Sequence, residues 1–390
     1  MKNFNYYNPA EIVFGVDSLN QLKPLLAKQN ISSLLFVYSG SFIKDLGIWT
    51  AVKKVCEELE VEFHENDAVI PNPEVELVRD LIIQGRSNNI DFVLGAGGGS
   101  AIDTAKAIAV GIPYSGDVWD LFEYKAVPEV AIPVGAISTI PASGSEASNC
   151  SIISNGHSKV GIEYDCIIPK FAIMDPTFTL SLPAYQTSCG IADILSHMLE
   201  RYFSNVAYTD TTDYLIEGAI QALLLNAQRL INNPKNLNAR SEVQCLAFLA
   251  HNNLLDIGRT ADWGSHRIEH ELSAQYGITH GEGMAIVTVA WMKYIAFKKP
   301  EKLAQLANRI FHIDYYNHSK TEMAEMLADN FRKFFISLHL KTTLVEMDIS
   351  SKYFEDMALR ATNNGTQTIG HYFPLNKNQI IDILKLAIEI

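Results

Sequence analysis

The chain has 390 residues, of which 48% are hydrophobic and 19% charged, a balance typical of a folded protein with a large core rather than of a disordered chain. A chain of this length favours two domains. Lysine and arginine total 31 against 44 aspartate and glutamate, a net charge of −13, and this excess of negative charge disfavours nucleic acid and anionic membranes as partners.

The sequence carries no sign of export or membrane insertion. Its first residues lack the basic start and continuous apolar run of a secretory signal. The apolar segment 130–145 is interrupted by prolines and glycines. The five cysteines are scattered and form no close pair. We therefore expect no transmembrane segment, and reduced thiols in a cytoplasmic protein.

Strand and helix patterns alternate in the first half of the chain. Short apolar runs rich in β-branched residues predict strands at 34–38, 91–94, 132–137 and 171–174. Helical spacing follows the first strand to about residue 60 and returns over 74–87 and 101–110. This alternation predicts an open α/β domain with a Rossmann-like parallel sheet.

Beyond the loop 175–183, the spacing of the apolar residues changes to that of helices. Apolar residues at three-to-four spacing occupy five segments, which are 191–203, 213–231, 240–255, 321–338 and 377–388. We place the domain boundary in that loop. The prediction is an α/β domain over residues 1–180 and an all-helical domain over residues 181–390, with a cleft between them.

A glycine-rich segment, residues 95–100, follows one predicted strand and opens a predicted helix. Backbone N–H groups and the positive end of the helix dipole then favour an anion such as pyrophosphate, and the missing side chains allow close approach. Ser100 is predicted to cap the helix and to donate to phosphate, and Asp103 and Lys106 follow on its first turns. The spacing differs from G-x-G-x-x-G, and a turn serving only chain geometry is the alternative.

Hydroxyl side chains gather again after the predicted strand 132–137. They suit a diphosphate or a nicotinamide carboxamide, and they come from Ser138, Thr139, Ser143 and Ser145. An ordinary surface loop is the alternative. Lys159 follows in a polar stretch, either to neutralise a phosphate or as a solvated side chain.

Two pairs of potential metal ligands lie four residues apart in helical runs. Asp193 and His197 share one helical face, and His266 and His270 share another. Asp193 lies among apolar residues, where an ionised carboxylate needs a partner. His280, in a predicted glycine-flanked loop, can add an imidazole. Four of these five groups suit Zn²⁺ or Fe²⁺; separate core or capping histidines are the alternative, and the spacing does not say which histidine binds.

Taken together, these motifs resemble the iron-containing alcohol dehydrogenase family, in its butanol dehydrogenase and NADPH-dependent aldehyde reductase branch. The resemblance spans nearly the whole chain and rests on four segments in order, namely 71–73, 97–106, 139–146 and 266–281. It implies the dehydroquinate synthase-like architecture, in which an α/β dinucleotide-binding domain precedes an all-α metal-binding domain. It also implies hydride transfer between NAD(P)H and a small aliphatic alcohol or aldehyde.

The resemblance also implies a metal centre and a catalytic group. Asp193, His197, His266 and His280 would hold one divalent cation, Fe²⁺ or Zn²⁺, and His270 would lie beside it. His270 is the candidate for relaying the hydroxyl proton, because no better placed acid is visible. Asp103 is the second candidate catalytic residue.

For the cofactor, the resemblance implies that glycines hold the pyrophosphate and that Thr139 and Ser143 lie along the nucleotide, with Lys159 near its ribose or phosphate. The turn 39–44 contains hydroxyls and Lys44 but no acid, which favours NADP(H) over NAD(H). The predicted cofactor-binding residues are Ser39, Gly40, Ser41, Gly97, Gly98, Gly99, Ser100, Asp103, Ser138, Thr139, Ser143, Ser145 and Lys159. A homodimer is expected from the resemblance alone.

Other activities stay open at this point. A glycerol dehydrogenase-like polyol oxidoreductase and a dehydroquinate synthase-like lyase share this architecture, and the lyase would consume no net NADH. A metal- or nucleotide-binding module without turnover is a third alternative. The side chains named above do not identify the physiological alcohol.

Overall fold

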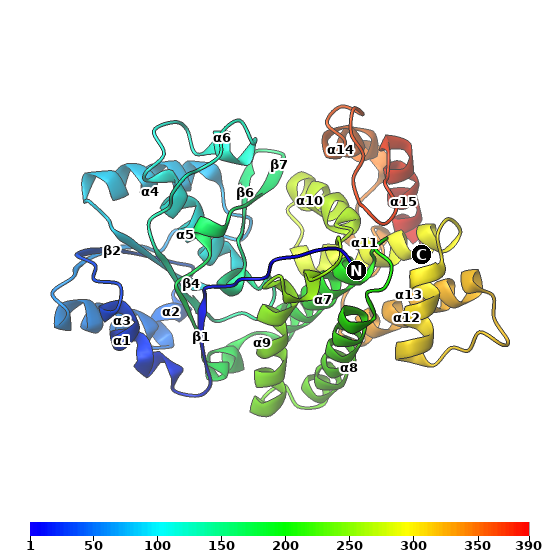
Figure 1. Cartoon of the computed structure of the whole chain (residues 1–390), viewed down its shortest axis with the longest axis horizontal. Helices are drawn as coiled ribbons and strands as arrows, with labels where there is room; N and C mark the ends of the chain where they lie inside the picture. The colour runs from blue at the N-terminus through cyan, green and yellow to red at the C-terminus, as the bar shows by residue number, and fades with distance from the viewer. Residues whose placement is uncertain (390) are drawn as a thin grey trace. The chain divides into compact units, whose positions relative to one another are not determined.

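The computed structural model describes residues 1–389 and divides into two compact units (Figure 1). One unit contains residues 7–182 together with 247–252, and the other contains residues 1–6, 183–246 and the chain from 253 onward. The division after Leu182 lies two residues beyond the boundary drawn from the sequence. The apolar pattern does not anticipate that residues 1–6 and 247–252 change units.

A six-stranded parallel sheet forms the centre of the α/β unit, in the order β1-β8-β5-β4-β2-β3. Its strands are β1 (Glu11–Phe14), β2 (Ser33–Tyr38), β3 (Glu62–Asn66), β4 (Phe92–Gly97), β5 (Val134–Ser138) and β8 (Phe171–Met174). The four inner strands are buried throughout, which is why they appear as continuous apolar runs. These four predicted strands are confirmed; the partly exposed edge strands β1 and β3 were not predicted.

The two faces of this sheet carry separate cores. Leu34, Phe36 and Tyr38 of β2 pack into one cluster, whereas Leu35 and Val37 pack into the other, as the period of two in a strand requires. Figure 1 shows helices α1 and α3 beside one face and α4 and α5 beside the other. The helices are α1 (Leu22–Ala27), α2 (Phe42–Asp45), α3 (Ile48–Glu58), α4 (Val75–Ser87), α5 (Gly99–Gly111) and α6 (Trp119–Phe122).

A separate antiparallel hairpin, β6 (Cys150–Asn155) and β7 (Ser158–Glu163), lies outside the main sheet. The sequence did not predict this hairpin. Its turn contains Gly156 at φ 58°, a backbone conformation that glycine adopts without strain. Ser154 of the hairpin pairs with Lys159, so the polar stretch that contains Lys159 is strand β7.

The connections that leave β2 and β4 lead to strands on opposite sides of this pair. The chain goes from β2 to the edge strand β3, and from β4 to β5 on the other side. In open α/β sheets, ligands bind beyond the carboxyl ends of strands at such a switch point. Tyr38 and Gly97 end β2 and β4 there.

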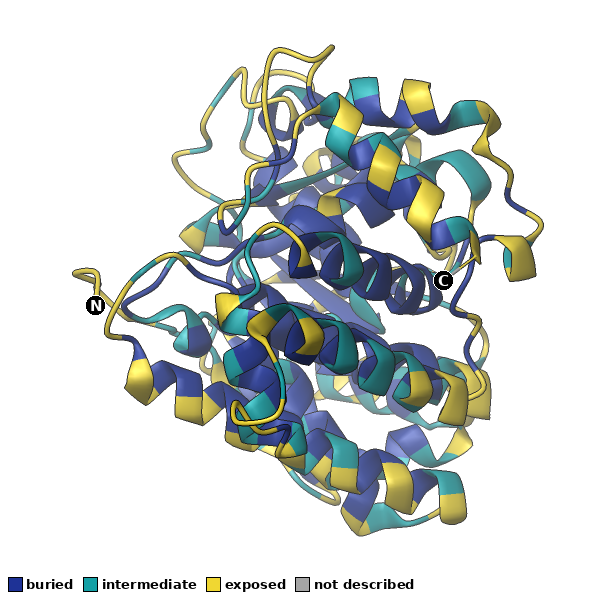
Figure 2. Cartoon of the chain, turned by 90° about the vertical axis from the view of Figure 1, so that its right-hand side faces the viewer, coloured by how far each residue is buried: buried dark blue, intermediate teal, exposed yellow. Residues whose placement is uncertain are grey.

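The second unit is helical, as predicted. The helices that follow β8 are α7 (Ala184–Tyr202), α8 (Asp210–Asn232), α9 (Leu237–His251), α10 (Gly264–Tyr276), α11 (His280–Ala296), α12 (Glu301–Phe311), α13 (Lys320–Ser337), α14 (Phe354–Ala361) and α15 (Lys377–Glu389). In Figure 2 many helices show a yellow exposed side and a dark-blue buried side. Helix α11 is buried almost throughout, so it has no amphipathic pattern. Within residues 1–389, no helix is long and apolar enough to cross a membrane.

Candidate active site

The glycine turn lies between β4 and α5 at the switch point of the sheet. Gly97 has φ 143°, which favours glycine, and a Cβ there would lie 2.8 Å from the Oγ atom of Ser39. A Cβ on Gly99 would lie 2.9 Å from Cβ of Ser143. The fold therefore brings the turn after β2 and the loop after β5 against the glycines.

One detail of this turn differs from the sequence-based prediction. Gly98 is the N-cap residue and α5 begins at Gly99, so Ser100 lies inside the first turn and does not cap the helix. Glycine is accepted at an N-cap, and its missing side chain keeps the first N–H groups of α5 open to an anion.

The loop after β5 offers an unsatisfied polar atom. Thr139 is 1% exposed, and its hydroxyl has no hydrogen-bond partner within the described part of the chain. The Thr139 backbone N–H donates to the Gly97 carbonyl (2.9 Å), which fixes the loop beside the glycine turn. Buried hydroxyls are normally hydrogen-bonded. An unsatisfied hydroxyl beside open helix N–H groups fits a bound dinucleotide.

Asp103 and Lys106 belong to a buried hydrogen-bond network within the α/β unit. The Asp103 carboxylate accepts hydrogen bonds from the Ser145 hydroxyl (2.5 Å) and the Ile152 backbone N–H (3.1 Å). Lys106 Nζ donates to the Ser145, Ser148 and Cys150 carbonyls at 2.5, 2.8 and 2.9 Å. These contacts fasten α5 to β6 and to the loop after β5, and we retain no catalytic role for Asp103.

Lys159 lies near the same network, and its charge acts on Asp103. Burial raises the pKa of the Asp103 carboxyl, and the charges of Lys106 and Lys159 oppose that rise. The Ser145 hydroxyl donates to Asp103, so it is committed to the network. Six of the predicted cofactor residues lie at the switch point, namely Ser39, Gly97, Gly98, Gly99, Thr139 and Ser143. Two others, Asp103 and Ser145, lie behind it.

Glu146 is expected to make the stability of the α/β unit depend on pH. Burial raises the pKa of this carboxyl from 4.5 to about 7, and the neighbouring Asp103 adds to the rise while Lys106 and Ser138 oppose it. Between those pH values the folded protein keeps a proton that the unfolded chain releases, so stability falls as pH increases. The shift corresponds to roughly 3 kcal/mol. We expect Glu146→Gln to flatten this fall and to be more stable than the wild type at pH 8.

The check is denaturant unfolding from pH 4.5 to 8. Glu129→Gln, at an exposed position, is the control and should follow the wild-type curve. Identical slopes for the wild type and Glu146→Gln would contradict a buried, protonated Glu146.

The predicted metal-binding residues come from three helices of the helical unit. Asp193 and His197 lie on α7, and His266 and His270 lie on α10. His280 is the first residue of α11, with Thr279 as the N-cap, so it does not lie in a loop as the sequence suggested.

Three of these side chains converge closely. The Asp193 Oδ1 atom lies 3.3 Å from Nε2 of His280 and 3.9 Å from Nε2 of His266. All three potential ligand atoms lie within 4.8 Å of one another. His197 approaches with its other ring nitrogen, Nδ1, which lies 3.8 Å from Asp193 Oδ1. The His197 ring stacks on His266 at 4.8 Å between centroids.

His270 lies at the margin of this cluster. Its ring centroid is 5.6 Å from that of His280 and 6.4 Å from that of His266. His270 also belongs to a second group of potential ligands, with Glu269 and His280. The pairing of His266 and His270 on one helical face therefore brings both imidazoles near His280.

The converging atoms fit a bound cation. Asp193 Oδ1 and His266 Nε2 are buried and have no hydrogen-bond partner among residues 1–389. The Nδ1 atom of His266 faces a carboxylate oxygen of Glu200 at 2.9 Å, which favours a proton on Nδ1 and a lone pair on Nε2. A lone pair and a carboxylate oxygen that face each other in a buried site repel unless a cation lies between them. Carboxylate and imidazole ligands suit Zn²⁺ or Fe²⁺.

Two buried glutamates behind the histidines were missed by the sequence analysis. Glu200 accepts from His266, and Glu269 contacts Nδ1 of His280. A signal was present, because each glutamate follows a metal-ligand candidate by three residues on the same helix, His197 in α7 and His266 in α10.

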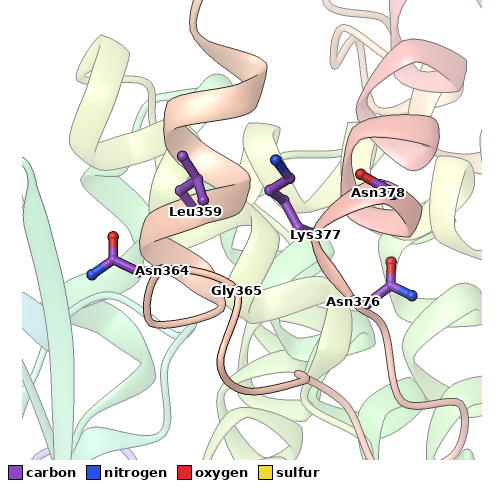
Figure 3. Close-up of a pocket in the computed structure, with 6 residues that line it drawn as sticks. All are labelled: Leu359, Asn364, Gly365, Asn376, Lys377 and Asn378. Atoms are coloured by element: carbon purple, nitrogen blue, oxygen red, sulfur yellow. The ribbon is translucent and has the colours of Figure 1, made fainter.

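A surface depression of about 240 Å³ lies elsewhere on the helical unit. Figure 3 shows it between the end of α14 and the start of α15, lined by Leu359, Asn364, Gly365, Asn376, Lys377 and Asn378. Lys377 forms a 3.1 Å ion pair with Glu355. The depression shares no residue with the metal-ligand cluster or the glycine turn.

Two family models cover the chain, that of the iron-containing alcohol dehydrogenases over residues 9–176 and the C-terminal model of the same family over residues 187–388. The chain belongs to the iron-containing alcohol dehydrogenase family. Dependence on a nicotinamide dinucleotide and on a bound metal accompanies this membership.

Individual relatives match over their full length. The chain is 36% identical to NADH-dependent butanol dehydrogenase A of Clostridium acetobutylicum over 99% of both proteins. It is 28% identical to the NADPH-dependent aldehyde reductase YqhD of Escherichia coli over 95% of both. The solved structure of NADH-dependent butanol dehydrogenase A from Thermotoga maritima superposes with a TM-score of 0.94 at 32% identity, covering 100% of this chain and 99% of that one.

Proposed function

We propose that this protein transfers a hydride between NAD(P)H and a small aliphatic alcohol or aldehyde, in a metal-dependent reaction similar to that of butanol dehydrogenases. The observation that carries the proposal is the convergence of Asp193, His266 and His280, whose ligand atoms lie within 4.8 Å of one another. The glycine turn between β4 and α5, in a position suited to a dinucleotide, supports it, as do the names of the relatives.

The proposed metal ligands are Asp193, His197, His266 and His280, and the ion is Fe²⁺ or Zn²⁺. When bound, the ion supplies a Lewis acid that polarises a carbonyl or lowers the pKa of an alcohol, and the nicotinamide ring accepts or supplies the hydride. The chain contributes one carboxylate charge from Asp193 and neutral imidazoles. Asp193, His197 and His266 are buried, which keeps bulk water away from the proposed ligands.

We propose His270 as the residue that exchanges the hydroxyl proton of the alcohol. It lies beside His280 without being one of the proposed ligands, and an imidazole is the side chain whose ordinary pKa suits proton transfer near neutral pH. A His270→Ala variant that kept the wild-type rate and pH profile would rule out this role.

For the coenzyme, we propose that the turn after β2 accepts NADPH in preference to NADH. Ser39 lies beside Gly97. Lys44 lies in the short helix α2 that follows this turn, and it is only loosely paired, since its Nζ lies 4.0 Å from Asp67 and both side chains are largely exposed. A lysine in this position is available to a 2′-phosphate. The names of the relatives include both coenzymes.

Replacing Lys44 with alanine tests this preference. We expect the KM for NADPH to increase about tenfold, equivalent to one charge-assisted hydrogen bond, with the KM for NADH unchanged. Lys53→Ala is the matched control, because Lys53 and Lys44 both lie near the Trp49 ring while Lys53 belongs to α3. Equal KM increases for both coenzymes would contradict a phosphate contact.

The activity itself is tested with protein reconstituted separately with Fe²⁺ and Zn²⁺. NADPH and NADH oxidation is followed with butanal and a panel of short aldehydes, and glycerol is included in the reverse direction. Metal-dependent oxidation of either coenzyme by an aldehyde supports the proposal. No coenzyme turnover with any combination would contradict it and would favour a lyase or a binding module.

We also propose a homodimer, for which the measurement is the solution mass, expected at twice the 43.4 kDa of one chain. The cytoplasmic location stays a prediction from the sequence.

A further inference from the structure

Two fully buried carboxylates lie behind the metal-ligand cluster in a repeated arrangement. Glu200 of α7 lies 2.9 Å from Nδ1 of His266 on α10. Glu269 of α10 contacts Nδ1 of His280 on α11. Each glutamate is 3% exposed or less, and each contacts a histidine on another of the three helices that carry the proposed ligands. The two contacts therefore link the three helices in series.

Both histidines turn the opposite ring nitrogen toward the same atom. Nε2 of His266 and Nε2 of His280 lie 3.9 and 3.3 Å from Asp193 Oδ1. A carboxylate at Nδ1 selects the tautomer with a proton on Nδ1 and fixes the ring plane. Without that acceptor, the imidazole is free to adopt the other tautomer, in which Nε2 carries a proton and binds no metal.

Glu200 also fixes the start of helix α10. The same Oε1 atom accepts from the His266 backbone N–H (2.9 Å) and from the Ser265 hydroxyl (2.7 Å). His266 lies in the first turn of α10, where backbone N–H groups have no partner within the helix. Glu200 therefore holds both the backbone and the ring of His266.

Glu269 is held in turn by its own helix and by a close approach of α11. The Ser273 hydroxyl, one turn further along α10, donates to its Oε1 atom. A Cβ on Gly283 of α11 would lie 2.9 Å from Cγ of Glu269. The glycine thus leaves the space in which the glutamate reaches His280.

We propose that Glu200 and Glu269 are positioning residues that set the metal affinity of this centre, each by holding one histidine with its Nε2 atom directed at Asp193. This inference rests on the metal site proposed above. Outer carboxylates of this kind are worth about 10–100-fold in metal affinity.

The experiment measures Zn²⁺ affinity by competition with a chromogenic chelator, for the full chain stripped of metal. We expect Kd to increase about 10–100-fold in Glu200→Gln and in Glu269→Gln, and by a smaller factor in Ser273→Ala, which leaves the glutamate in place. Glu271→Gln is the matched control. Glu271 also lies on α10 but pairs with Arg360 at 2.7 Å, and its variant should keep the wild-type Kd.

A second readout separates positioning from folding. Co²⁺ absorption reports the geometry of the bound ion, and we expect altered bands in the two glutamine variants but not in Glu271→Gln. Ser273→Ala keeps the test of Glu269 informative if Glu269→Gln fails to fold, and Ser265→Ala, which removes one donor to Glu200 and leaves that glutamate in place, does the same for Glu200. Wild-type Kd and bands in all variants would overturn the inference while leaving the proposed site intact. A wild-type chain that binds no Zn²⁺ or Co²⁺ would overturn the proposed site and the inference with it.

Discussion

Asp193→Asn is expected to abolish metal binding and to lower kcat for aldehyde reduction by at least about 10³-fold. The Oδ1 atom of Asp193 lies within 3.9 Å of a ring nitrogen in each of three histidines, so it is the atom on which the cluster centres. A neutral amide oxygen is a weaker ligand than a carboxylate. The lost Lewis-acid assistance is worth several kcal/mol, and each 1.36 kcal/mol changes the rate tenfold. Metal analysis and steady-state kinetics check the result.

Thermal unfolding provides the control for this variant. In the wild-type chain Asp193 Oδ1 is buried without a hydrogen-bond partner among the described residues, which costs stability when no cation is bound. In EDTA, Asp193→Asn should therefore unfold at the wild-type temperature or above it. Added Zn²⁺ should raise Tm only in the wild type, because a ligand stabilises the state that binds it. A variant that retained one ion per chain would contradict the assignment of Asp193.

Gly281→Ala is expected to destabilise the helical unit by about 3 kcal/mol, the upper end of the usual range for an overpacked site, and to weaken metal binding. A Cβ at Gly281 would lie 2.6 Å from the carbonyl carbon and 2.8 Å from the Cα atom of Cys189 on α7. These are backbone atoms, so a rotamer change does not relieve the overlap, and α11 would have to move away from α7. His280 precedes the substituted residue, and Asp193 lies one turn beyond Cys189 on α7. The same movement would separate the two proposed ligands.

Gly218→Ala is the control for this prediction. Gly218 lies on the exposed side of α8, and a Cβ there would meet no described atom within 4 Å. Alanine should stabilise this helix by about 0.5–1 kcal/mol. Urea unfolding of both variants, together with Zn²⁺ titration, gives the comparison. Wild-type stability in Gly281→Ala would contradict the prediction, because it would show that α7 and α11 move apart at little cost in free energy of unfolding.

Much of the fold was predictable because its signals are local. The inner strands are buried on both faces and appear as unbroken apolar runs, and α4, α8, α13 and α15 carry amphipathic periods. The edge strands β1 and β3 and the hairpin β6–β7 carry mixed polar patterns. Helix α11 is apolar on nearly all sides. A mixed polar pattern does not distinguish a strand from a loop. An apolar pattern on all sides does not distinguish a buried helix from a buried strand.

The candidate site followed the same division between local and distant information. The sequence by itself determined the fold class, the glycine turn that begins α5, and the two pairs of potential ligands, since spacing along one helix fixes which side chains share a face. Only the tertiary structure decided which atoms meet, that Asp103 turns into a buried network and that Glu200 and Glu269 lie behind the histidines. These contacts join different elements of the fold, and the packing that creates them depends on the whole chain rather than on any local period.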